Sequence, residues 1–427
     1  MYDQGKVVFL SDTTQPKLKK IVFWNAAGSL CSAASSFLYL FIVTRVMGAK
    51  VAGAWSITIA IAQLMWTIGV FEATTYFATD ANNRFTSEQY FGFKFITCAL
   101  MAVVSFFYVM SFGFDAYKMT LALWLCALKL VDAFGMYYFA AFQKTGRLDI
   151  SGFSSVWQVL VSVISFTFMV LSFKNVIAGV VAATVCKALW IVIYNTRRLK
   201  QIAPITGPDF NPQAMKGLFF ELLPLFLATY MANYLSNIPK YAIESLGTST
   251  MQAKFSIVFM PSFVINLFLI FVMRPLLTPL ANTWARRQVR SFLSTTVKIL
   301  VAVVGMTLAV LGLSWFIGIP ILEAVFNLDL TSARTAMMVV MAGGGLASCS
   351  NVLYNGIIIL RRQRLVLVAY TIALILAGAL STPLVSHLGL TGAALTYGVA
   401  SAALLAVYAV VFIISVKSET RCSQEAS

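Results

Sequence analysis

The sequence predicts an all-α integral membrane protein with about 12 transmembrane helices in two six-helix bundles. The first observation behind this prediction is composition: 60% of the 427 residues are hydrophobic and 11% are charged, whereas about a quarter of the residues in a soluble domain are charged. The second is that apolar stretches of about 20 residues, the length that crosses a bilayer, follow one another along the chain. At that depth a helix satisfies its own backbone hydrogen bonds.

The predicted spans are separated by short breaks that are charged or contain glycine or proline. A basic segment with Lys17, Lys19 and Lys20 precedes the first span, and a turn at Gly48 separates the first two. In chain order the spans are 21–45, 54–78, 95–113, 118–142, 152–172, 175–195, 217–240, 254–281, 295–317, 334–358, 364–385 and 390–415.

Lysine and arginine predict the orientation of these spans, because short cytoplasmic loops carry an excess of them. With the N-terminus inside, the cytoplasmic side collects about two thirds of the 31 lysines and arginines. An odd number of spans would invert the later loops and remove this bias. We therefore expect a multi-pass protein of the cytoplasmic membrane, with the N-terminal segment 1–20 and the tail 416–427 both in the cytoplasm.

A charged segment close to the midpoint divides the spans into six and six. This linker, 196–216, contains Pro204, Pro208 and Pro212, which favour an irregular connection. The sequence thus predicts an N-terminal bundle over 21–195 and a C-terminal bundle over 217–415.

The two predicted bundles contain a weakly repeated motif at equivalent positions. The letters VMG (46–48) and GAWSI (53–57) in the first bundle correspond to SLG (245–247) and AKFSI (253–257) in the second. Each copy joins the first two helices of its bundle. This placement favours an internal duplication over chance similarity, and parallel repeats of this kind occur in transporters with a midplane site.

Three stretches resemble the Wzx-type oligosaccharide-lipid flippases of the MOP superfamily, and the twelve-span layout extends the resemblance over the chain. The first stretch comprises NAAG (25–28), TRVMG (44–48) and GAWSI (53–57); the second comprises YFATD (76–80), RF (84–85) and Tyr90; the third comprises NIPKYAIE (237–244), MP (260–261) and MRPLL (273–277).

The resemblance implies a V-shaped pair of bundles that works by alternating access. The implied substrate is a polyprenyl-diphosphate-linked oligosaccharide, a precursor of a cell-surface polysaccharide such as the O-antigen of lipopolysaccharide. Other polysaccharide assembly proteins would be partners.

Charged residues on or at the ends of the predicted helices are the candidate site residues, because a charge within a bilayer costs about 2.5–3.5 kcal/mol on insertion scales and usually faces protein or water. The third, fifth and ninth to twelfth predicted helices are nearly free of such charges. The cations Arg45, Lys129, Lys187, Lys240 and Arg274 are candidate substrate-binding residues, and the carboxylates Glu72, Asp132, Glu221 and Glu244 are candidates for charge pairing or ion coupling.

Lys129 and Asp132 stand out because both lie near mid-span. Their i, i+3 spacing places them on one helix face, where they either line a cavity or form a buried pair that only fixes packing. Lys187 has no nearby carboxylate on its own helix and therefore requires a partner from another helix or water. Arg45, Lys240 and Arg274 lie near helix ends, where snorkelling to the interface is the alternative explanation.

The surplus of cations suits an anionic diphosphate head group. A competing hypothesis is a multidrug or metabolite antiporter that uses membrane carboxylates such as Glu72 and Asp132 to bind a cation. A third possibility, a membrane scaffold that transports nothing, does not require charges that converge at mid-span.

Other function classes receive little support from the sequence. It contains no phosphate loop, zinc signature or nucleophile elbow, so neither an enzyme nor a metal or cofactor is expected. The net charge of +16 arises mostly from the loop bias and suits anionic membrane lipids rather than nucleic acid.

Overall fold

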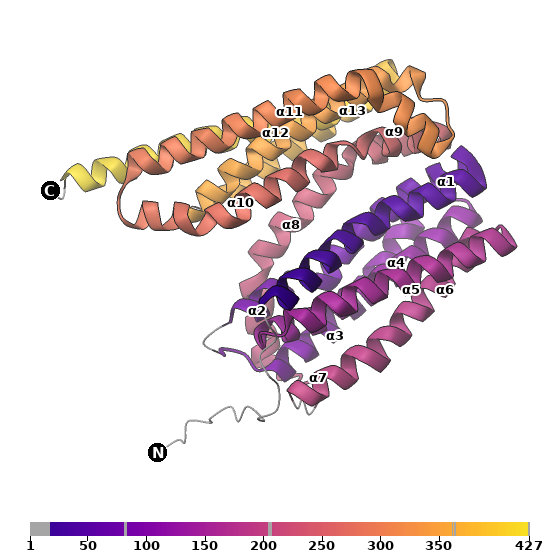
Figure 1. Cartoon of the computed structure of the whole chain (residues 1–427), viewed down its shortest axis with the longest axis horizontal. Helices are drawn as coiled ribbons and strands as arrows, with labels where there is room; N and C mark the ends of the chain where they lie inside the picture. Colours follow the sequence, from indigo (N-terminus) through magenta and orange to yellow (C-terminus); the bar gives the residue numbers. More distant parts are fainter. Residues whose placement is uncertain (1–17, 81–82, 204–206, 361, 363, 426–427) are drawn as a thin grey trace. The chain divides into compact units, whose positions relative to one another are not determined.

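The computed structural model describes residues 18–80, 83–203, 207–360, 362 and 364–425, and this part of the chain is helical apart from short connections (Figure 1). The helices are α1 Leu18–Val70, α2 Ala73–Thr79, α3 Ser87–Ser111, α4 Ala116–Lys144, α5 Leu148–Phe173, α6 Val176–Trp190, the π-helix η1 Ile191–Asn195, α7 Thr196–Ile202, α8 Pro212–Leu246, α9 Ser249–Phe259, α10 Ser262–Ala285, α11 Val289–Phe326, the 3-10 helix η2 Thr331–Ala333, α12 Arg334–Ile359 and α13 Arg364–Glu425.

Most of the predicted spans correspond to these helices, but span 254–281 is divided between α9, which ends at Phe259, and α10, which begins at Ser262. Within the described residues, 9 helices are long and apolar enough to cross a membrane. Two of them, Lys19–Thr79 and Leu365–Lys417, each cover two predicted spans. In each, a glycine with non-helical geometry separates the two spans: Gly48 (φ 81°) in α1 and Gly389 (φ 55°) in α13. The predicted all-helical membrane fold is confirmed.

The second predicted span, 54–78, is not one continuous helix. α1 ends at Val70 and α2 begins at Ala73, and the two residues between them, Phe71 and Glu72, have φ values of 47° and 54°. The left-handed conformation costs a residue with a Cβ roughly 1–2 kcal/mol. Neither residue is glycine or proline, so the local sequence carries no signal for this break.

The chain forms two compact units. Unit 1 contains Met1–Tyr39 and Met65–Phe226, and unit 2 contains Leu40–Leu64 and Leu227–Ser427. These limits differ from the predicted bundles 21–195 and 217–415, because residues 40–64 are grouped with unit 2 and residues 196–226 with unit 1. The division at the linker 196–216 stays a prediction.

Helices α1 and α5 approach closely within unit 1 through two glycines. A Cβ on Gly28 would lie 2.9 Å from the carbonyl oxygen of Gly152, and a Cβ on Gly152 would lie 2.6 Å from the backbone nitrogen of Asn25. Small residues at such a contact let two membrane helices pack backbone to backbone.

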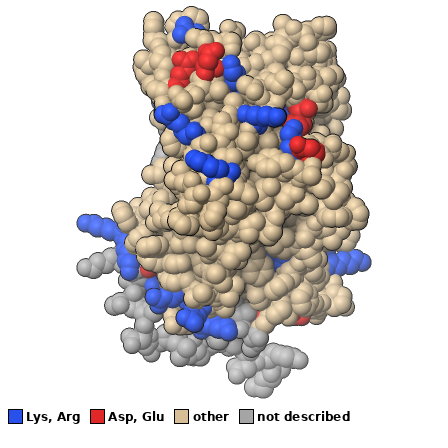
Figure 2. Space-filling view, turned by 90° about the vertical axis from the view of Figure 1, so that its right-hand side faces the viewer, with Lys and Arg blue, Asp and Glu red and all other residues tan. Residues whose placement is uncertain are grey.

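The face of the protein shown in Figure 2 is largely uncharged. On the face in Figure 2, the charged side chains form small groups with wide uncharged areas between them. Large apolar side chains are exposed in both units, among them Phe107 and Phe173 in unit 1 and Phe316 in unit 2. Such exposure is unfavourable in water and favourable in lipid, as expected for a multi-pass membrane protein.

Candidate functional site

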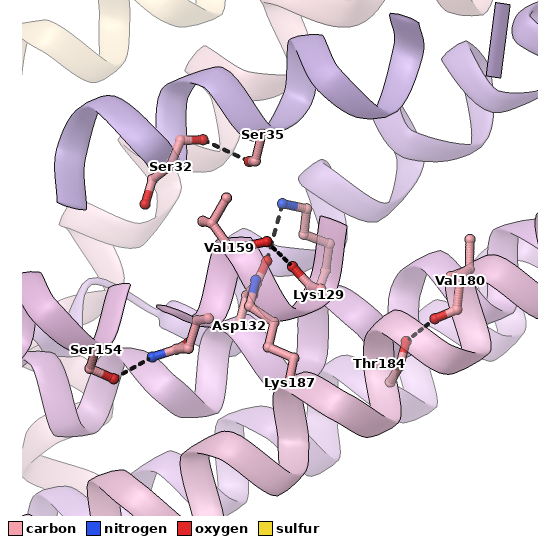
Figure 3. A network of polar contacts seen from close by, with 11 residues as sticks. Ser32, Ser35, Lys129, Asp132, Ser154, Val159, Val180, Thr184 and Lys187 are labelled. Carbon is pink, nitrogen blue, oxygen red and sulfur yellow. Dashed lines mark hydrogen bonds and ion pairs between the residues drawn. The ribbon is translucent and has the colours of Figure 1, made fainter. Parts of the chain in front are cut away.

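Three of the candidate site residues predicted from the sequence contact one another in unit 1. Asp132 and Lys129 lie one turn apart on α4, and Lys187 comes from α6. The Nζ of Lys129 lies 3.3 Å from Oδ2 of Asp132, and the Nζ of Lys187 forms an ion pair with Oδ1 of the same carboxylate. Figure 3 shows the two lysines on either side of Asp132.

This charge cluster, defined as Lys129, Asp132 and Lys187, carries a net positive charge because two ammonium groups share one carboxylate. Each carboxylate oxygen is bound by a different lysine. The side chains are 20%, 20% and 12% exposed, respectively, so the cluster is largely shielded but not sealed. Its excess cation can bind an anion that reaches it.

A stripe of polar residues on α5, which belongs to the same unit, was not predicted from the sequence. Ser151, Ser154 and Ser162 are buried, and with Gln158 they recur every three or four residues, which places them on one helix face. Serine hydroxyls bond readily to the backbone of their own helix and are common in membrane helices. A periodicity search for serine and glutamine, in addition to charges, would have found this stripe.

Ser154 connects α5 to the end of α6. Its hydroxyl accepts hydrogen bonds from Gln158 Nε2 at 2.9 Å and Trp190 Nε1 at 3.2 Å, and it donates to Asn195 Oδ1 at 2.5 Å. Asn195 ends the π-helix η1, which follows directly after α6. π-Helical turns are rare and frequent at functional sites, and this one lies just beyond Lys187.

Glu221 and Glu72 also belong to unit 1. Glu221 of α8 accepts a hydrogen bond from the Tyr76 hydroxyl at 2.5 Å and forms an ion pair with Arg84 at 2.5 Å. Glu72 stands at the break between α1 and α2. Tyr76 and Arg84 come from the second stretch that carried the family resemblance.

The remaining candidates belong to unit 2. Arg45 Nη2 donates to the carbonyl oxygen of Ala324, near the end of α11, at 2.8 Å. The Nζ of Lys240 lies 6.0 Å from the ring centroid of Phe259. Glu244 is half-buried near the end of α8, and the side chain of Arg274 lies outside the described part of the structure.

Asp80 holds the loop between α2 and α3. Its carboxylate accepts hydrogen bonds from the backbone nitrogens of Arg84 at 3.1 Å and Phe85 at 3.3 Å, and from the Tyr90 hydroxyl at 3.1 Å. Burial by itself would raise the pKa of Asp80, but these hydrogen bonds and the nearby Lys144 lower the pKa below its usual value.

No candidate metal centre emerges from the described residues: no three histidine, cysteine, aspartate or glutamate side chains among them come together as a possible ligand set. Lys94 is not among the candidate residues predicted from the sequence. It precedes the predicted span 95–113, but it lies within α3 and is 1% exposed.

Comparison with solved structures reveals the fold. A multidrug resistance MATE family transporter of the MOP superfamily, in its inward-facing conformation, matches with a TM-score of 0.69 and 12% sequence identity, covering 92% of this chain and 96% of that one. The Vibrio cholerae MATE transporter VcmN matches with a TM-score of 0.65 and 14% identity, covering 94% and 97%. The chain has the fold of MOP superfamily transporters.

The same fold includes a flippase. The lipid II flippase MurJ, in its inward closed conformation, matches with a TM-score of 0.69 and 12% identity, covering 89% of this chain and 86% of that one. At the level of sequence, neither the family models nor the curated proteins compared with the chain match it. The similarity is therefore one of helix arrangement.

Proposed function

We propose that this protein is a flippase that moves a polyprenyl-diphosphate-linked oligosaccharide across the cytoplasmic membrane by alternating access, with both termini in the cytoplasm. Lys129 and Lys187 bind the diphosphate. The observation that carries the proposal is the charge cluster, in which two ammonium groups share the single carboxylate of Asp132. A diphosphate carries several negative charges, so it gains more from this excess cation than a neutral or cationic ligand does.

The surroundings of the cluster support a polar substrate that crosses the membrane interior. Ser154 of α5, drawn with the lysines in Figure 3, provides a hydroxyl group, and its hydrogen-bond partner Gln158 provides an amide group; such groups can bond to sugar hydroxyls. The lipid tail of the substrate stays in the bilayer, where exposed apolar side chains such as Phe107 contact it. The likeness to a lipid II flippase supports a lipid-borne substrate.

The other predicted residues enter the same proposal in supporting roles. Arg45, Lys240 and Arg274 are proposed as further substrate-binding cations. Glu72, Glu221 and Glu244 are proposed as carboxylates that pair with cations during transport.

A cation antiporter is the second candidate, and the likeness to multidrug transporters favours it. Such a transporter needs a membrane carboxylate that is free to bind a cation or a proton. Asp132 is the candidate, but each of its two oxygens is already bound by a lysine. A cationic drug at this position would meet a net positive charge and be repelled.

The test is transport by purified protein in proteoliposomes, with a diphosphate-linked lipid oligosaccharide as one substrate and a cationic dye as the other. Each lost hydrogen bond to a charged group is worth about 1.5–3 kcal/mol, so Lys129→Gln and Lys187→Gln are each expected to reduce lipid-oligosaccharide transport ten- to a hundredfold. Lys200→Gln, at an exposed lysine of α7, is the matched control and should transport normally.

Normal lipid-oligosaccharide transport by a well-inserted Lys129→Gln, Lys187→Gln double variant would overturn the proposal. Dye transport by the wild-type protein that is lost in Asp132→Asn would establish the antiporter instead.

A further inference from the structure

Lys94 of α3 is buried against the end of another membrane helix. Its Nζ donates hydrogen bonds to the carbonyl oxygens of Gly69 at 2.9 Å and Val70 at 3.2 Å. Thr97, one turn further along α3, donates its hydroxyl to the same Gly69 carbonyl at 3.0 Å. Two successive carbonyls at the end of α1 thus receive three hydrogen bonds from α3.

These two carbonyls immediately precede the break in the second predicted span. The last four carbonyls of a helix have no amide donor within that helix. Phe71 and Glu72, which follow Val70, both adopt the left-handed conformation, which residues with a Cβ rarely adopt in succession. Because nothing in the local sequence favours this conformation, a tertiary contact has to hold it.

A buried lysine at this position destabilises the fold unless its ammonium group forms hydrogen bonds that an apolar side chain could not form. Burying an ammonium group has a large desolvation cost, and an apolar side chain of similar length would fill the same volume without that cost. The ammonium can replace the missing amide donors because it offers three N–H bonds and no acceptor. Its hydrogen bonds to the carbonyl oxygens of Gly69 and Val70 therefore supply the donors that the C-terminal end of α1 needs.

The break determines where α2 lies relative to α8. The ring of Phe71 stacks on Phe226 of α8, with centroids 4.3 Å apart and an angle of 9° between the planes. Tyr76, on the short helix that follows the break, donates its hydroxyl to Glu221 of the same α8 at 2.5 Å. Both contacts depend on the change of direction at Phe71 and Glu72.

We propose that Lys94 is a positioning residue that holds the second span bent at Phe71 and Glu72, and thereby sets α2 against the first part of α8. Without the ammonium, the Gly69 carbonyl keeps the Thr97 hydroxyl, but the Val70 carbonyl finds a new donor only if the backbone after Val70 returns toward helical geometry. That change swings α2 and withdraws Tyr76 from Glu221. The inference does not depend on the substrate of the transporter.

The test measures the distance between α2 and α8 in the full-length protein in detergent. Nitroxide spin labels are placed at Thr79 in α2 and Lys216 in α8, because both residues are exposed. Wild-type protein should give one narrow distance distribution. Lys94→Met should shift the distance by about 5 Å, on the order of one helical turn, or broaden it by a similar amount, whereas Lys94→Arg, which keeps the charge and donors, should retain the wild-type distance.

Two further variants separate this role from a general loss of structure. Thr97→Val removes one of the three hydrogen bonds and should produce a smaller shift. Thr296→Val is the matched control, because the hydroxyl of this buried threonine donates to the carbonyl oxygen of Phe292 in its own helix; it should leave the distance unchanged. A second label pair within α3, at Ser87 and Met110, reports whether α3 itself stays folded.

A wild-type distance between α2 and α8 in folded Lys94→Met would overturn the proposal. If Lys94→Met does not fold, Lys94→Gln and Thr97→Val carry the test, and wild-type distances in both would overturn it as well.

Discussion

Arg84 Nη2 lies 2.5 Å from Oε1 of Glu221, so an ion pair joins the loop before α3 to α8. The same carboxylate accepts the hydroxyl proton of Tyr76. The two partners of Glu221 differ in exposure, since the Arg84 side chain is 64% exposed and Tyr76 is half-buried. An exposed ion pair contributes about 0–1 kcal/mol, whereas a hydrogen bond to a charged group contributes about 1.5–3 kcal/mol.

We therefore expect Glu221→Ala to lower the melting temperature of the detergent-solubilised protein more than Arg84→Gln does. Thermal unfolding followed by intrinsic fluorescence measures both. Equal losses for the two variants would mean that the Tyr76 hydrogen bond adds nothing to the ion pair.

The charge cluster predicts an order of stability among its variants. Asp132→Asn leaves two ammonium groups close together without their shared counter-ion, whereas Lys129→Gln or Lys187→Gln leaves one intact ion pair. Removing the partner of a buried charge costs about 3–5 kcal/mol, and partial exposure of the cluster reduces this figure. Asp132→Asn should therefore have a lower melting temperature than either single lysine variant, and the opposite order would contradict the described pairing.

The contact between α1 and α5 predicts a strong effect of a single methyl group. A Cβ at position 152 would overlap the backbone of α1 around Trp24 and Asn25, so Gly152→Ala should destabilise the protein by about 1–3 kcal/mol. Gly305 is the control, because a Cβ there would meet no atom within 4 Å. Gly305→Ala should be neutral or stabilising by about 0.5–1 kcal/mol, since alanine is the better helix former. Similar thermal stability of the two variants would refute the close helix contact.

The hydrogen bonds of Asp80 predict a pH dependence of stability. Because the pKa of Asp80 is lowered in the folded protein, its contribution to stability is complete above its unfolded pKa of about 3.9 and is lost as the pH falls through the lower folded value. The melting temperatures of the wild-type protein and Asp80→Asn should differ most at pH 5–7 and converge below about pH 4. A difference that stays constant from pH 6 to pH 3 would show that the charge of Asp80 is not responsible.

The sequence by itself determined the class of the protein and the approximate positions of most of its membrane helices. Helix formation in a bilayer depends on the length and hydropathy of a continuous segment, and both are properties of neighbouring residues. For the same reason the division at Gly48 was predictable, since glycine adopts the left-handed conformation at little cost. The spacing of Lys129 and Asp132 on one helix face also followed from the sequence.

Only the tertiary structure decided which residues meet across helices. Lys187 binds Asp132 because α6 packs beside α4 with that face inward, and no pattern within α6 specifies its rotation. Lys94 binds the end of α1, and the break at Phe71 and Glu72 exists without any glycine or proline. Such contacts depend on how helices distant in sequence are rotated about their axes and packed against one another. Hydropathy indicates only which segments lie in the membrane.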